Sequence, residues 1–191
     1  MTYPPLTQRE HEVEAFVAGL ASVVERAAAI YVSSPLTSGR RAAEWHSQNG
    51  QGENPEGFKR HVFTPNRADA AEYVRELRER TGREVIDPGA VDDISGWAQD
   101  DYRVCWGRVI QEYAKAVVFR EGWQYSSGCA YEFVVAQEAG LEVVDESWSP
   151  LSVADGRTLL SSAREDLRSQ GSSVDFLDGV LSSLDSTATA K

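Results

Sequence analysis

The sequence AVVFREGWQYSSGCAYEF, at residues 116–133, decides the fold. It begins with four apolar residues, which predict a buried strand because β-branched and aromatic side chains favour strands. A polar, aromatic loop follows from Arg120 to Ser127, and Gly128 opens a helix that should end near Gly140. A strand that leads through a short loop into a helix is the repeating unit of α/β proteins.

The rest of the chain repeats this unit. Apolar periodicity predicts strands at 29–33, 84–87, 116–119 and 141–144, and helices at 7–26, 66–80 (capped by Asn66), 97–113 and 128–140. Strands that alternate with helices predict a flavodoxin- or Rossmann-like parallel sheet of about four to five strands, with helices on both faces. A ligand should bind at the carboxyl ends of the strands, where the loops after Ser33, Asp87 and Phe119 meet.

Composition predicts where this α/β unit ends. We expect residues 1–148 to form it, residues 149–184 to form a helical C-terminal extension, and residues 185–191 to be disordered. The extension either fills the core or docks onto a neighbouring subunit. Residues 36–65 are polar and predict a long loop, with a helical part around residues 40–46.

Charge and cysteine usage exclude several classes of function. The 191 residues carry a net charge of −11, which disfavours binding to nucleic acid. Two cysteines and three histidines stand in no metal-ligand spacing, so we expect buried thiols, no metal and no cofactor. No stretch is apolar enough to span a membrane, and the N-terminus does not resemble a signal peptide. We therefore expect a cytoplasmic protein.

Glu132 is the first candidate for chemistry. It lies about one turn inside the helix that follows Ser126-Ser127-Gly128, on the side that faces the strand ends. The exposed N–H groups at such a helix start suit an anion such as phosphate. A carboxylate among apolar neighbours suits catalysis, but a helix-dipole or capping role explains it equally well.

Two further segments have similar alternatives. Asp100 and Asp101 lie in the first turn of a predicted helix, where acidic residues also serve the helix dipole. Trp123 can stack on a base or fill the core. Residues 31–41, YVSSPLTSGRR, combine a strand end, a small-residue turn and two arginines, which predicts a phosphate cradle without P-loop or dinucleotide-binding spacing.

Together these segments resemble the nucleoside 2-deoxyribosyltransferase superfamily, which includes the nucleoside 5′-monophosphate N-glycosidases. The resemblance covers residues 29–145 and rests on Tyr31 in the first strand and on the spacing Ser126-x-Gly128-x-x-x-Glu132-x-x-x-Ala136. Serine rather than aspartate at position 126, and a Ser-to-Arg turn from Ser34 to Arg40, are similar to the monophosphate hydrolases. A longer helix after Asp101 and a longer 41–65 insertion depart from the family pattern.

The resemblance implies hydrolysis of the N-glycosidic bond of a nucleoside 5′-monophosphate, with Glu132 as the nucleophile. Asp101 would be the acid, with Asp100 as second choice and Asp87 as a weaker alternative, and Tyr31 would orient Glu132. The residues implied in substrate binding are Ser33, Ser34, Arg40, Trp123, Tyr125, Ser126 and Gly128. A homodimer or larger homo-oligomer is also implied. Base transfer between nucleosides, cleavage of NAD or ADP-ribose derivatives, and a non-catalytic nucleotide sensor remain alternatives.

Overall fold

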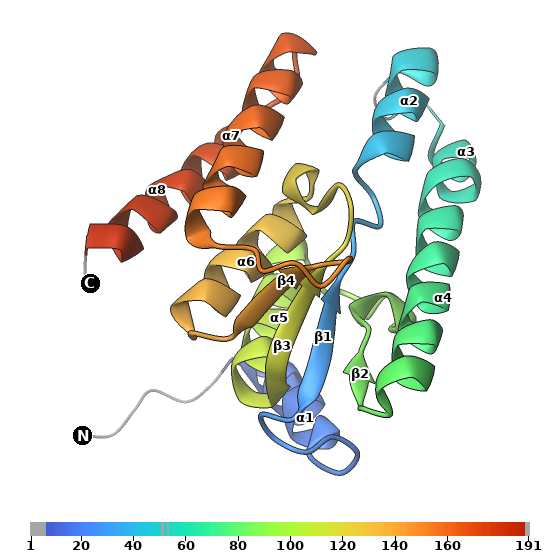
Figure 1. The fold of residues 1–191 in the computed structure, drawn as a ribbon. Coiled ribbons are helices and arrows are strands. Elements are labelled where there is room, and N and C mark those ends of the chain that lie inside the picture. The colour runs from blue at the N-terminus through green and yellow to red at the C-terminus, as the bar shows by residue number, and fades with distance from the viewer. Residues whose placement is uncertain (1–6, 51, 53, 190–191) are drawn as a thin grey trace.

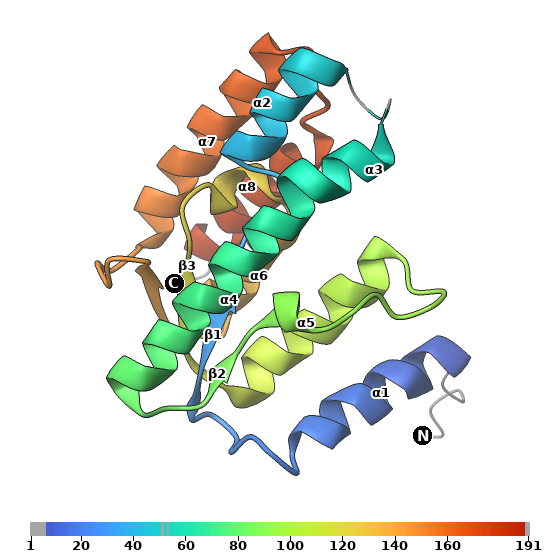
Figure 2. The ribbon, with the colours of Figure 1, turned by 90° about the vertical axis from the view of Figure 1, so that its right-hand side faces the viewer.

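The computed structural model describes residues 7–50, 52 and 54–189. Its single four-stranded sheet has the order β2-β1-β3-β4, and every pair of neighbouring strands is parallel. The strands are β1 (Ala29–Ser33), β2 (Val85–Ile86), β3 (Ala114–Phe119) and β4 (Glu142–Asp145). Helices cover both faces of this sheet (Figures 1 and 2), so the predicted α/β fold is confirmed.

The helices follow the predicted alternation, with additions in the 36–65 segment and at the C-terminus. The α-helices are α1 (Gln8–Leu20), α2 (Arg40–Asn49), α3 (Pro55–Phe58), α4 (Thr64–Thr81), α5 (Gln99–Tyr113), α6 (Ser127–Glu138), α7 (Val153–Ser169) and α8 (Asp175–Thr189). A π-helix, η1 (Lys59–Phe63), joins α3 to α4, and short 3₁₀ turns lie at η2 (Pro88–Ala90) and η3 (Trp123–Tyr125).

Alternation along β1 assigns the helices to the two faces of the sheet. Ile30 and Val32 point to the face that α4 covers, where they pack with Val74 and Leu77. Tyr31 points to the opposite face, in the larger core that α1, α5, α6, α7 and α8 form. Ser33 shares that second face, because side chains two residues apart in a strand lie on the same side. The face of Tyr31 and Ser33 is therefore the one that α6 approaches.

Local expectations were corrected in two places. The 36–65 segment is not mainly loop: α2, α3 and η1 occupy most of it. Two ring stacks join these helices, between Trp45 and His61 (5.3 Å between centroids) and between His46 and Phe58 (5.2 Å). Asn66 is not a helix cap, because α4 begins at Thr64; its amide donates instead to the carbonyl of Leu36.

The C-terminal extension is part of the core. Leu160, Leu177 and Leu184 are each no more than 1% exposed and belong to the cluster beneath α5 and α6. At Gly156 an added Cβ would lie 2.1 Å from Phe133 Cζ, so only glycine permits α7 to approach α6 this closely. α8 continues to Thr189, past the expected start of a disordered tail, and residues 190–191 lie outside the described part. Of the two expected roles, filling the core is confirmed.

Residues 7–50, 52 and 54–189 contain neither a metal-binding cluster nor a membrane-spanning helix. Within these ranges, no helix combines the length and the apolarity that crossing a bilayer requires. No three His, Cys, Asp or Glu side chains of the described residues gather as metal ligands. Cys105 and Cys129 are buried free thiols, and burial raises the pKa of each to about 12.

Candidate active site

Glu132 is a buried carboxylate held by two hydroxyl groups of β1. Ser126 caps α6 by accepting from the N–H of Cys129, and this start sets Glu132 on the helix side that faces β1. The phenol of Tyr31 donates to Oε1 at 2.7 Å, and the hydroxyl of Ser33 donates to Oε2 at 2.6 Å. Glu132 is 8% exposed. The alternative of a helix cap does not describe it, because both carboxylate oxygens bind the sheet.

Burial sets the electrostatics of this group. Loss of solvent raises the pKa of Glu132 from 4.5 to about 7, against the lowering effect of the Ser33 and Tyr31 hydrogen bonds. Burial and the neighbouring Glu132 charge raise the pKa of Tyr31 well above its ordinary value, so the phenol keeps its proton. A carboxyl group with a pKa near neutrality can be a nucleophile or exchange a proton at physiological pH.

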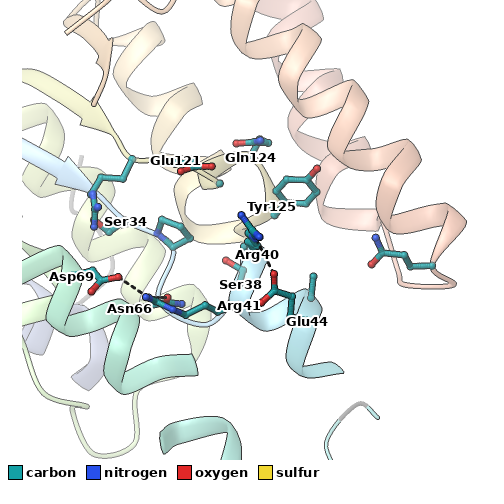
Figure 3. A pocket seen from close by; sticks show the side chains of 16 residues that line it. Ser34, Ser38, Arg40, Arg41, Glu44, Asn66, Asp69, Glu121, Gln124 and Tyr125 are labelled. Atoms are coloured by element: carbon teal, nitrogen blue, oxygen red, sulfur yellow. Dashed lines mark hydrogen bonds and ion pairs between the residues drawn. The ribbon is translucent and has the colours of Figure 1, made fainter. Parts of the chain in front are cut away.

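A cavity of about 770 Å³ lies beside this group, at the carboxyl ends of β1 and β3 (Figure 3). Its wall comes from four segments: the β1–α2 loop with α2, the first turns of α4, the β3–α6 loop, and the end of α7. The connections from β1 and β3 run to opposite faces of the sheet, which makes this the switch point where open α/β sheets bind ligands. Glu132 itself is not in the wall; Ser33 contacts Glu132, and the adjacent Ser34 lines the cavity.

The cavity wall is polar and mixed in charge. It contains three arginines and three carboxylates, namely Arg40, Arg41, Arg120, Glu44, Asp69 and Glu121. Arg40 binds Glu44 at 2.8 Å and Arg41 binds Asp69 at 2.6 Å. The hydroxyl oxygens of Ser34 and Ser38 are buried and have no hydrogen-bond partner among the described residues. Two unsatisfied hydroxyls beside arginines suit an anionic ligand, because buried polar groups normally have partners.

The three aspartates considered for the role of the acid make their contacts away from Glu132 in this conformation. Asp101 accepts from the N–H of Ala98 at 2.7 Å and lies 3.4 Å from Arg9. Asp100 is exposed and binds Arg103 at 2.6 Å. Asp87, at the end of β2, is 9% exposed and accepts from the N–H of Gly89, and burial raises its pKa. Asp101 lies on α5, which packs next to α6. Asp87 comes two residues after Val85, so its side chain points to the same face of the sheet as Val85, the face that α4 covers.

The two aromatic residues of the β3–α6 loop separate into different roles. Trp123 is 3% exposed and stacks on Phe133 at 4.7 Å, so in this structure it is a core residue. Tyr125 lines the cavity (Figure 3). Gly128, in the first turn of α6, lies close to the start of α5, since an added Cβ would lie 3.8 Å from Gln99 Nε2 and from Ser126 Oγ.

Several wall residues were missed by the sequence reasoning. Asn66, Asp69 and Gln170 come from segments that carry no strand-end signal, and they meet only through the fold, whereas Ser38 lies in the 31–41 turn but was not singled out there. Glu121 and Gln124, in contrast, follow directly after a predicted strand, and that position was the available signal.

Comparison with known proteins gives one match. A family model described as "Domain of unknown function (DUF4406)" matches residues 64–145, which is less than half of the chain. This segment runs from α4 to β4 and contains Glu132 and the β3–α6 loop, whereas β1 and the α7–α8 hairpin lie outside it. No curated protein and no solved structure matches the chain.

Proposed function

We propose that this protein hydrolyses the N-glycosidic bond of a nucleoside 5′-monophosphate, with Glu132 as the nucleophile. The observation that carries the proposal is the Glu132 carboxylate, buried at the switch point of the sheet and fixed by the Tyr31 and Ser33 hydroxyls. Burying a carboxyl group without an opposite charge is unfavourable, so the arrangement needs a chemical reason. The resemblance to the nucleoside 2-deoxyribosyltransferase superfamily supports the same role for Glu132.

In the first step, an oxygen of the ionised Glu132 attacks the anomeric carbon of the sugar. The bond between this carbon and the base nitrogen breaks, its electron pair leaves with the base, and a glycosyl ester forms on Glu132. Tyr31 and Ser33 hold the two oxygens in line and limit the charge that remains on the carboxylate. A water molecule then attacks the same carbon and releases Glu132, as in retaining glycosidases.

The departing base needs a proton, and we assign its donation to Asp101. Asp101 lies at the start of α5, on the face of the sheet that carries Glu132. In the second step its carboxylate takes a proton from the attacking water, so protons balance over the cycle. The contact of Asp101 with the Ala98 N–H must open when substrate binds. Asp101→Asn should then lower kcat strongly, whereas Asp100→Asn and Asp87→Asn should not.

The 5′-phosphate would bind in the cavity. Ser34 and Ser38 offer two buried hydroxyls without partners, and Arg40 stands at the adjoining start of α2. Hydroxyl and guanidinium donors are ordinary phosphate partners. A double Ser34→Ala, Ser38→Ala variant should raise KM for a monophosphate about a hundredfold or more, since two hydrogen bonds to a charged group contribute about 1.5–3 kcal/mol each. Activity on the corresponding free nucleoside, if measurable, should not change.

The deciding experiment is incubation with nucleoside 5′-monophosphates, 2′-deoxynucleoside 5′-monophosphates, free nucleosides and NAD, with chromatographic detection of released base. We expect release from a monophosphate by the wild-type protein and none by Glu132→Gln. Glu138→Gln is the matched control, because Glu138 lies on the same helix but is exposed. Release that survives in Glu132→Gln would remove Glu132 as the nucleophile. Release from NAD or a free nucleoside alone would replace the substrate.

A further inference from the structure

We propose that α7 belongs to this site: Asp166 is a positioning residue that holds Tyr125 in the cavity wall, and Gln170 is a specificity-determining residue for the base. The inference rests on the proposed function for the identity of the ligand, but the geometry of the wall is independent of it. Asp166 and Gln170 lie one turn apart at the end of α7, on the helix side toward the β3–α6 loop.

The first contact joins the tip of α7 to the loop. The phenol of Tyr125 donates to Oδ2 of Asp166 at 2.6 Å, and Tyr125 lines the cavity (Figure 3). This hydrogen bond to a carboxylate raises the pKa of Tyr125 to about 12, so the phenol remains the donor at any physiological pH. The ring is therefore restrained from the α7 side.

A second, indirect contact links the N-terminal end of α7 to the same loop. The close approach at Gly156 seats α7 on Phe133, whose ring stacks on Trp123 at 4.7 Å between centroids. Trp123 and Tyr125 are the first and last residues of η3, so α7 restrains this turn at two points, directly through Asp166 and through Phe133. The buried leucines of α7 and α8 keep the hairpin itself in place.

Gln170 completes the wall opposite α2. It lines the cavity together with Arg40, Arg41 and Glu44 from α2, and Figure 1 shows α7 and α2 standing on opposite sides above the strand ends. Its amide is neutral and both donates and accepts hydrogen bonds. In a wall that also contains the ring of Tyr125, such an amide suits the edge of a heteroaromatic base better than it suits a phosphate. The arginines and the Ser34 and Ser38 hydroxyls already suit the phosphate.

The positioning role is tested with Asp166→Ala, and Glu165→Ala is the matched control. Glu165 is the adjacent exposed carboxylate of α7, and it pairs with Arg164 and Arg168 rather than with the loop. We expect Asp166→Ala to raise KM for the preferred monophosphate about three- to tenfold, the range of one hydrogen bond, with kcat within about twofold. Asp166→Asn, whose amide oxygen can still accept from the phenol of Tyr125, should restore KM partly. A KM equal to that of the wild type in Asp166→Ala would overturn the positioning role.

Two more measurements separate this inference from the proposed function. Without ligand, amide hydrogen exchange at residues 120–128 should speed up in Asp166→Ala and not in Glu165→Ala. Unchanged exchange in Asp166→Ala would overturn the positioning role, whatever the ligand is. Gln170→Ala should change the ratio of kcat/KM between bases about tenfold, and an unchanged ratio would overturn the specificity role. If the wild type binds a monophosphate in calorimetry but releases no base, the proposed hydrolysis fails. The effects of Asp166 and Gln170 are then measured as ratios of Kd between the variants and the wild type and between monophosphates of different bases.

Discussion

The burial of Glu132 makes a prediction about stability that requires no substrate. The pKa of Glu132 is raised to about 7 in the folded protein, from 4.5 without burial. Between these two pH values the folded state holds a proton that the unfolded state releases, so rising pH favours unfolding. The effect is absent below about pH 4.5 and complete above about pH 7.

The magnitude follows from the two pKa values. A difference of one in pKa corresponds to about 1.4 kcal/mol, so ionisation of Glu132 should destabilise the fold by about 3 kcal/mol at pH 8.5. Glutamine resembles the protonated carboxyl in shape and can still meet the hydroxyls of Tyr31 and Ser33. Glu132→Gln should therefore leave the free energy of unfolding nearly unchanged at pH 4.5 and raise it by up to about 3 kcal/mol at pH 8.5.

The assay is urea unfolding followed by tryptophan fluorescence, between pH 4.5 and 8.5 at constant ionic strength. The difference between the variant and the wild type is the quantity of interest, because other titrating groups cancel in it. Glu138→Gln, on the exposed side of α6, removes a carboxylate from the same helix and controls for the change of sequence. A difference for Glu132→Gln that stays flat with pH would refute the reasoning, since the carboxylate would then be as well solvated as in the unfolded chain.

Three other predictions concern the site and its support. For base release, kcat/KM should rise with pH through about 7, because Glu132 must be ionised to attack; a rise centred near pH 4.5 would contradict this. Tyr31→Phe removes one donor to the carboxylate and should move that rise upward by about one in pH or more, as a pH–rate profile would show. Gly156→Ala should lower the free energy of unfolding by about 1–3 kcal/mol, since the methyl group would overlap the ring of Phe133. Gly19→Ala, where the Cβ meets nothing within 4 Å, should not lower it, and equal urea midpoints for the two variants would argue against the close packing of α7.

The sequence was most informative where local periodicity and burial agree. The alternation of strands and helices predicted the sheet, and a carboxylate among apolar neighbours placed Glu132 near its carboxyl edge. The role of Tyr31, in contrast, was implied by the resemblance to the nucleoside 2-deoxyribosyltransferase superfamily. The 36–65 segment was misjudged since its helices are polar: in α2 only Ala42 is buried. Ring stacks such as Trp45 on His61 support these helices, and contacts between residues far apart in the chain leave no periodic signal.

The same reason explains what was missed in the loop after β3. From the sequence alone, a tryptophan and a tyrosine two residues apart cannot be told apart in role. Only the packing of α6 and α7 gives them different environments. Phe133 takes Trp123 into the core, while Asp166, 41 residues downstream, holds Tyr125 at the cavity. The roles of these two aromatics therefore depend on the C-terminal hairpin, whose docking could not be decided from its composition.

The extent of the family match has a consequence for how function should be inferred from it. Residues 64–145 supply Glu132 and the β3–α6 loop, but both hydroxyls that bind Glu132 come from β1, outside the match. Without Tyr31 and Ser33 the buried carboxylate would lose the two contacts that lower its pKa, and it would be protonated over a wider range of pH. The proposed nucleophile thus requires the hydroxyl pair as well as the glutamate. Chains that share the matched segment should be compared first at the positions of Tyr31 and Ser33, since a chain with apolar residues there would keep the fold and lose an ionised Glu132 at neutral pH.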